Sequence, residues 1–141
     1  MKTATVVCSA LSITYVNLVP YLCRLPRGVS WAAQYLPDEG RLVLGLLFFG
    51  VFASLPAIPL IVAFVYRQQL PATLLVCVAT VTALLIHWHH DYDLASDAQA
   101  AIGLIFIPIY ALGLTTALGA GSAAVELLIR RLRRSPTNTG R

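Results

Sequence analysis

The sequence predicts an all-α, polytopic integral membrane protein, and its composition, its uncharged runs and its short connections are the observations that predict it. The chain has 141 residues, of which 58% are hydrophobic and 11% are charged, and its mean hydropathy is +0.78. An ordinary soluble domain carries roughly 25% charged residues. Because so few polar residues are present to cover a core of this size, lipid has to cover the rest.

The apolar runs predict a bundle of four transmembrane helices. A membrane-spanning helix needs about 20 mostly apolar residues, since each residue advances the helix by about 1.5 Å. The expected spans are residues 3–22, 42–66, 71–88 and 98–128. Together they make residues 1–134 one transmembrane domain, followed at 135–141 by a polar tail that we expect to be disordered.

The first span has an alternative interpretation as a cleaved signal peptide. Lys2 supplies a basic start, and residues 30–32 (Ser-Trp-Ala) resemble a cleavage site with small residues. Arg24 and Arg27 stand before that site and argue against cleavage. A retained helix is therefore the favoured prediction.

The second and third spans are joined only by residues 67–70, which predicts an antiparallel hairpin. Pro56 and Pro59 fall within the second span, where each removes a backbone donor and favours a kink.

The last span begins with the pattern Ser96-Asp97-Ala98-Gln99, which is typical of a capping box, and its helical pattern continues to about Leu132. Such a helix is longer than one membrane crossing. Glu126 and Arg130 are four residues apart, which favours a solvated ion pair. Small residues spaced by four let another helix approach closely and predict a packing interface formed by Ala117, Gly119, Ala120, Gly121, Ala123 and Ala124.

Orientation follows from the Lys and Arg residues near the ends of the spans. With both termini in the cytoplasm, seven basic residues lie inside and three, Arg24, Arg27 and Arg41, lie outside. A basic cluster at the membrane surface decides this count, and its members are Arg130, Arg131, Arg133 and Arg134. The prediction is an N-in, C-in, multi-pass protein of the inner (plasma) membrane. Basic residues beside an apolar segment indicate lipid contact rather than nucleic acid.

One cluster of chemically versatile side chains stands out near the end of the third span. Its members are His87, His89, His90, Asp91 and Asp93. If the helix continues through them, His87, His90 and Asp91 share one face, and imidazole with carboxylate is a ligand set for Zn or Cu. A role in proton transfer is a second possibility. A hydrated external cap, with Trp88 and Tyr92 at the membrane interface, is the simplest interpretation.

No catalytic residue is predicted, because no nucleophile motif and no phosphate-binding glycine loop is present. The three cysteines, Cys8, Cys23 and Cys77, have no CxxC spacing and are expected to be small buried residues.

The leading functional hypothesis is a small non-enzymatic membrane protein that acts through helix–helix contacts, with another membrane protein or with copies of itself. The role would be that of an accessory subunit or a protective partner. In architecture alone the chain resembles the small basic polytopic immunity proteins that protect bacteria from membrane-acting toxins, although no motif defines that family here. The alternative hypothesis is a membrane protein that handles metal ions or protons through the His/Asp cluster.

Overall fold

The computed structural model describes residues 2–34, 50–93 and 100–134, and within these ranges it contains helices and turns but no β-strand. The helices are α1 (Lys2–Leu22), η1 (Leu25–Arg27), α2 (Val29–Ala33), α4 (Ala57–Val65), α5 (Pro71–His89) and α6 (Ala100–Arg134). Three helical segments are long and apolar enough to cross a membrane: Thr3–Arg27, Pro71–His89 and Ile102–Arg133. The all-helical class is therefore confirmed, and three of the expected spans coincide with helices that are long and apolar enough to cross a membrane.

The apolar segment Gly50–Val65 is shorter than a full crossing within the described residues. Residues 50–52 are helical, residues 53–56 form turns, and α4 begins after Pro56. The missing N–H of Pro56 explains why the helix is interrupted there. Pro59 lies in the first turn of α4, where its missing N–H costs nothing. The sequence favours a kink at both prolines, whereas the structure breaks the helix before α4 at Pro56 and continues it through Pro59. Residues 42–49 of the expected span lie outside the described residues.

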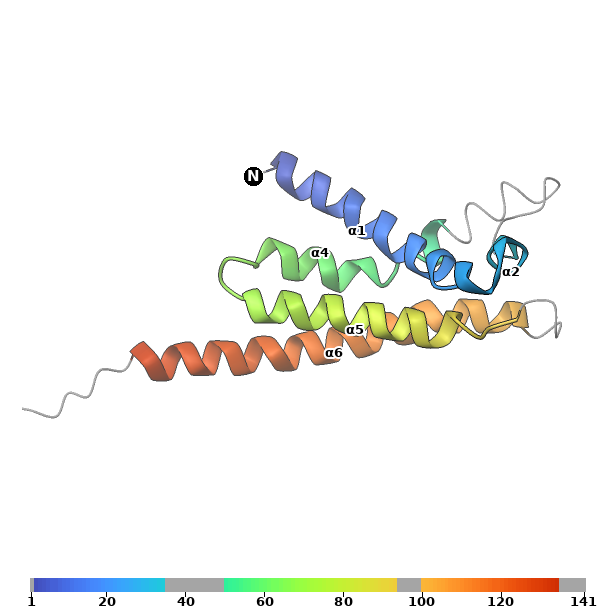
Figure 1. Cartoon of the computed structure of the whole chain (residues 1–141). Helices are drawn as coiled ribbons and strands as arrows, with labels where there is room; N and C mark the ends of the chain where they lie inside the picture. The colour runs from blue at the N-terminus through green and yellow to red at the C-terminus, as the bar shows by residue number, and fades with distance from the viewer. Residues whose placement is uncertain (1, 35–49, 94–99, 135–141) are drawn as a thin grey trace, which may run out of the picture.

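The hairpin predicted from the short connection is also confirmed. The turn after α4 is closed by hydrogen bonds from the backbone N–H groups of Gln69 and Leu70 to the carbonyl of Tyr66, at 2.9 and 2.8 Å. Pro71 then occupies the first position of α5, where its fixed φ angle suits a helix start. As a result α4 and α5 run antiparallel and side by side (Figure 1).

The longest helix, α6, has 35 residues; it runs antiparallel to α5 and extends beyond the start of α5 (Figure 1). A Cβ atom on Gly119 would lie only 2.7 Å from Sγ of Cys77, so this glycine lets the two helices approach closely. The capping box at residues 96–99 and the tail at 135–141 lie outside the described residues.

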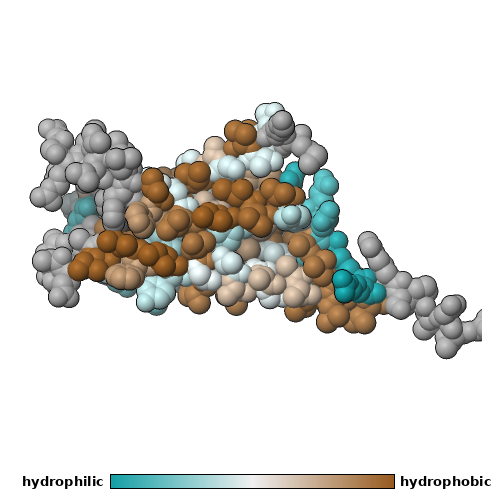
Figure 2. Space-filling view, turned by 180° about the vertical axis from the view of Figure 1, so that it is seen from behind, coloured by the Kyte–Doolittle hydropathy of each residue, from teal (hydrophilic) through white to brown (hydrophobic). Residues whose placement is uncertain are grey.

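Successive long segments alternate in direction, so that the start of α1 and the end of α6 lie at the same end of the molecule (Figure 1). A small core holds the helices together. It includes Val16 and Val19 of α1, Leu60 of α4, Val81 of α5 and Ala111 of α6. Outside this core most large apolar side chains are exposed, and they cover the flanks of the bundle, whereas hydrophilic residues gather where α6 ends (Figure 2). This distribution suits a bundle surrounded by lipid.

Candidate functional site

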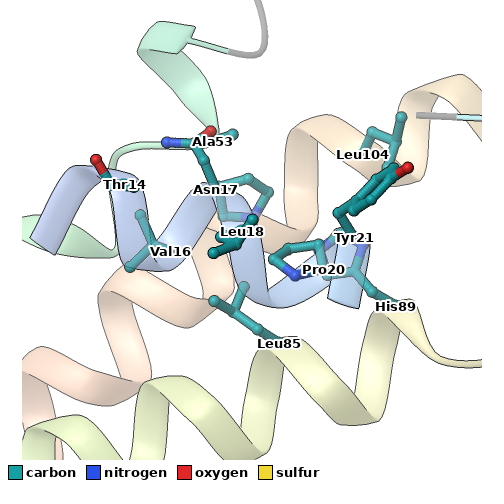
Figure 3. Close-up of a pocket in the computed structure, with 11 residues that line it drawn as sticks. Thr14, Val16, Asn17, Leu18, Pro20, Tyr21, Ala53, Leu85, His89 and Leu104 are labelled. Carbon is teal, nitrogen blue, oxygen red and sulfur yellow. The ribbon is translucent and has the colours of Figure 1, made fainter. Parts of the chain in front are cut away.

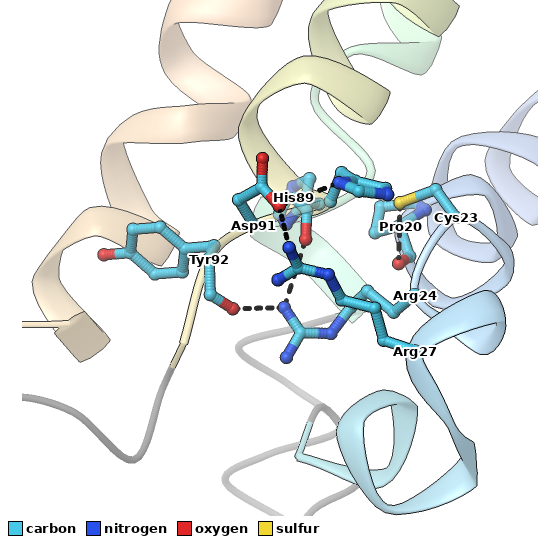
Figure 4. Close-up of polar contacts among 8 residues, drawn as sticks. Pro20, Cys23, Arg24, Arg27, His89, Asp91 and Tyr92 are labelled. Carbon is cyan, nitrogen blue, oxygen red and sulfur yellow. Dashed lines mark hydrogen bonds and ion pairs between the residues drawn. The ribbon is translucent and has the colours of Figure 1, made fainter.

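The end of the bundle opposite the C-terminal end of α6 contains a charged side chain that is completely buried. Arg24 lies two residues after the end of α1 and is 0% exposed. Its Nε and Nη2 donate to the carbonyl of Trp31 at 3.1 and 3.0 Å, and Nη2 also donates to Oε1 of Gln34 at 2.7 Å. Its Nη1 donates to the carbonyls of His89, at 3.1 Å, and Tyr92 (Figure 4). These bonds occupy all five N–H donors of the guanidinium.

A second, more exposed layer of charged groups surrounds Arg24. Nη2 of Arg27 lies 2.5 Å from Oδ1 of Asp91, and the same oxygen lies 2.9 Å from Nδ1 of His90. The guanidiniums of Arg24 and Arg27 lie 4.8 and 5.3 Å from the ring centroid of Trp31, in cation–π geometry. The segment after α1 is thereby joined to the end of α5.

The structure separates the three histidines. The helix ends at His89, and His90 caps it, with its backbone N–H donating to the carbonyl of Ile86 at 2.9 Å. His87 is exposed, His89 is buried, and His90 pairs with Asp91. Asp93 instead accepts a hydrogen bond from Nε2 of Gln34, at 3.1 Å.

Among the described residues no three His, Cys, Asp or Glu side chains are grouped closely enough to hold a metal ion. Binding of Zn or Cu by His87, His89, His90, Asp91 and Asp93 stays an untested hypothesis from the sequence. The three cysteines are free; Cys8 and Cys77 are buried as expected, and Cys23 is half-buried.

Sequence reasoning missed the role of Arg24, which it treated as one of several external positive charges. The signal that was available is the position of Arg24 at the end of an uncharged run, close to Trp31 and Gln34, which are typical partners of a guanidinium. The partners on α5 are backbone carbonyls some 65 residues away, and these leave no trace in the sequence.

A groove lies between α4 and α6, with α5 as its floor, and it has a volume of about 330 Å³. Three of the predicted interface residues, Gly119, Ala120 and Ala123, line it together with Val62 of α4. Thr115 also lines it and is 0% exposed, and within the described part of the chain its Oγ1 has no hydrogen-bond partner. Small side chains and one unsatisfied hydroxyl therefore share the same groove.

The other three predicted interface residues lie on a different face of α6. Ala117, Gly121 and Ala124 are exposed, and a Cβ atom on Gly121 would meet nothing within 4 Å. The six small residues thus divide into two sets, one in the groove and one on the outer surface of the helix.

The basic cluster lies at the far end of α6, where Arg131 and Arg133 are exposed. Arg130 donates from Nη2 to Oε1 of Glu126 at 3.1 Å, as its spacing predicted. The expectation that Glu126 is solvated was wrong, because its side chain is only 14% exposed and its Oε2 accepts bonds from the backbone N–H and the hydroxyl of Thr73, both at 3.2 Å. Glu126 caps the first turn of α5 from a neighbouring helix. The side chain of Arg134 lies outside the described residues.

Comparison with protein-family models, curated proteins and solved structures gives no match. The fold and its surface define the class: an all-helical protein with three helices that are long and apolar enough to cross a membrane, and whose apolar flanks suit contact with the lipid bilayer.

Proposed function

We propose that this is a four-span, N-in, C-in protein of the plasma membrane that acts without catalysis, by packing against a transmembrane helix of another membrane protein. Its role is that of an accessory subunit or a protective partner. The observation that carries this proposal is the groove between α4 and α6, which Gly119, Ala120 and Ala123 line with small side chains.

The groove has the features by which one transmembrane helix receives another. Association within lipid depends on close van der Waals packing and on hydrogen bonds between helices, and both require small residues at the contact. Gly119, Ala120 and Ala123 supply the small surface.

The distribution of charge supports the proposed orientation. At the end of the bundle where α6 ends, Arg131 and Arg133 are exposed. At the opposite end Arg24 is buried, and Arg27 is paired with Asp91. Free positive charge therefore gathers at the end that the positive-inside rule assigns to the cytoplasm.

Filling the groove tests the proposed contact. The full chain, expressed in its own membrane, is crosslinked, extracted in a mild detergent and scored for the complex that it forms. Ala120→Leu, which places bulk in the groove, is expected to reduce recovery of the complex on the order of tenfold. The matched control is Ala83→Leu, because Ala83 is exposed on the outer face of α5.

A third variant, Gly121→Leu, places bulk on the outer face of α6 without an internal clash. Loss of the complex with Gly121→Leu but not with Ala120→Leu would reject the groove and assign the contact to the outer face. Two differently tagged copies of the chain show whether the partner is a second copy. Recovery of one tag with the other would show that the partner is a second copy of this chain and not another membrane protein.

Reporter fusions after Gln69 and after Asp93 test the four-span topology. The Gln69 fusion is expected to report the cytoplasm and the Asp93 fusion the opposite side. The same compartment for both fusions would show that α5 does not cross the membrane and would overturn the topology.

A further inference from the structure

The C-terminal end of α6 projects beyond the start of α5 (Figure 1). Oε2 of Glu126 accepts a hydrogen bond from the backbone N–H of Thr73, so Glu126 lies level with the first turn of α5. From there α6 continues to Arg134, which adds about 12 Å at 1.5 Å per residue. The helix α5 is about 28 Å long, close to the roughly 30 Å of a hydrocarbon core. A bilayer that matches α5 therefore leaves the end of α6 in a head-group layer.

This projecting segment has a large apolar face. Residues spaced by three and four lie on one side of a helix. On this side the members are exposed aliphatic side chains: Val125 (57%), Leu128 (57%), Ile129 (45%) and Leu132 (67%). Such a face is stable at the boundary between head groups and acyl chains, where lipid covers it.

The apolar face points away from the rest of the bundle. Glu126 and Arg130 occupy the side of the segment that is turned toward α5, where the Glu126 carboxylate also accepts from the hydroxyl of Thr73 at 3.2 Å. No helix of the described chain is bonded to the apolar side, and its four side chains are all exposed. The surroundings of the bundle, rather than a part of it, must cover this face.

Two exposed arginines flank the apolar face. At 3.6 residues per turn, Arg131 and Arg133 fall on its two edges, and both side chains are exposed. Within the described residues neither of them makes an ion pair, whereas Arg130 is paired with Glu126. No acidic residue follows Glu126 in the sequence. The edges therefore carry positive charge that the protein itself does not balance, and hydrophilic residues are prominent at this end in Figure 2.

We propose that residues 125–134 of α6 bind anionic phospholipids, with the apolar face against the acyl chains and with Arg131 and Arg133 on the lipid phosphates. An apolar helix face with basic edges is attracted to anionic lipid at a membrane surface, and a guanidinium can bind two phosphate oxygens at once. The sequence predicts lipid contact for the basic cluster as a whole, and the structure removes Arg130 from the site. The proposal rests on the membrane placement given above, but not on the α4–α6 groove or a protein partner.

The direct test places the purified full chain in phosphatidylcholine nanodiscs that contain a small fraction of a lipid with a photoactivatable diazirine on its acyl chain. The probe is either phosphatidylglycerol or phosphatidylcholine with the same chains. Phosphatidylglycerol is expected to label residues 125–134 on the order of tenfold more than phosphatidylcholine. Equal labelling by the two probes would show ordinary lipid contact and would overturn the proposal.

A crevice beside the C-terminal half of α1 serves as the internal reference. It has a volume of about 410 Å³, and Leu18, Leu85 and Leu104 are among the residues that line it (Figure 3). The described residues of its lining include no Arg or Lys. The two probes are therefore expected to label the crevice equally, and the same preference for phosphatidylglycerol there would contradict a specific site at the end of α6.

Substitution of the arginines tests the charge. Arg131→Gln and Arg133→Gln are each expected to lower the preference for phosphatidylglycerol roughly threefold, and the double variant is expected to remove it. Both side chains are exposed, so folding does not depend on them. The matched control is Arg67→Gln in the α4–α5 turn, where Nη1 of Arg67 donates to the carbonyl of Phe64 at 3.1 Å. An equal loss in Arg67→Gln, or an unchanged preference in the double variant, would reject the site.

Salt and free phosphate distinguish the source of the anion. Raising the ionic strength from about 0.1 M to about 1 M shortens the Debye length from about 10 Å to about 3 Å, so the preference for phosphatidylglycerol is expected to fall. Inorganic phosphate at constant ionic strength is expected not to displace the lipid, because it cannot cover the apolar face. Displacement by inorganic phosphate would show that the arginines bind a free anion and would overturn the assignment to lipid.

Discussion

Arg24 closes the end of α5 by donating from Nη1 to the backbone carbonyl of His89 at 3.1 Å. The last carbonyls of a helix have no partner within the helix, and here a side chain from the segment after α1 satisfies one of them. The favourable charge of a guanidinium at a helix C-terminus adds to this bond. The contact joins two helical segments that are long and apolar enough to cross a membrane, through a residue that is completely buried.

Replacement of Arg24 is expected to destabilise the protein strongly. Arg24→Met keeps the length of the side chain but leaves the carbonyls of His89, Tyr92 and Trp31 without their donors, at a cost of about 2 to 4 kcal/mol. Unfolding of the purified protein in detergent micelles measures this loss. Arg27→Met is the control, because the Arg27–Asp91 pair is exposed and contributes at most about 1 kcal/mol. Equal losses for the two variants would contradict the special role of Arg24.

The contact between Tyr15 and Thr82 offers a test of whether α1 is retained. The hydroxyl of Thr82 donates to the carbonyl of Val78, so Tyr15 is the donor in its 2.5 Å bond to Thr82. Tyr15→Phe is expected to lower stability by about 1 kcal/mol if α1 remains in the mature protein. Intact mass measurement reports the retained chain directly. A mature protein that lacks α1 would be unaffected by this substitution, and the signal-peptide alternative would then hold.

Glu126 is expected to stabilise the fold mainly through its bonds to Thr73 of α5, and less through its ion pair with Arg130 of α6. Glu126→Ala removes the acceptor for the N–H and hydroxyl of Thr73 and is expected to cost about 1 kcal/mol, in the range of a lost helix cap. Arg130→Ala, which removes only the ion-pair partner, is expected to cost less. Thermal unfolding in detergent compares the two variants. A larger effect for Arg130→Ala would mean that the ion pair, not the cap, is the important contact.

The His/Asp cluster is expected to hold no stoichiometric zinc or copper in the purified protein. The reason is that His89 is buried, while His90 pairs with Asp91 and His87 is exposed. Elemental analysis of the natural protein and of a variant with alanine at all three histidines checks this expectation. One equivalent of metal in the natural protein that disappears in the variant would establish the metal-binding alternative.

Some contacts were predictable because they are local. The spacing of Glu126 and Arg130 predicts their ion pair, and the prolines predict the interruption before α4, since both effects act within one or two helical turns. The exposure of Glu126 was not predictable, because Thr73 approaches it from another helix. Likewise, small residues spaced by four indicate close packing but cannot show which of them face α5, the groove or the lipid.

The sequence by itself determined the all-helical class, three helices long and apolar enough to cross a membrane, and the α4–α5 hairpin, because hydropathy, helix length and short connections act locally along the chain. Only the tertiary structure decided that Arg24 is buried at the end of α5, that α5 stops before His90, and that Gly119 and Gly121 belong to different surfaces. Each of these depends on which atoms of distant helices meet, and a backbone carbonyl or an open space beside a glycine has no signature in the order of residues.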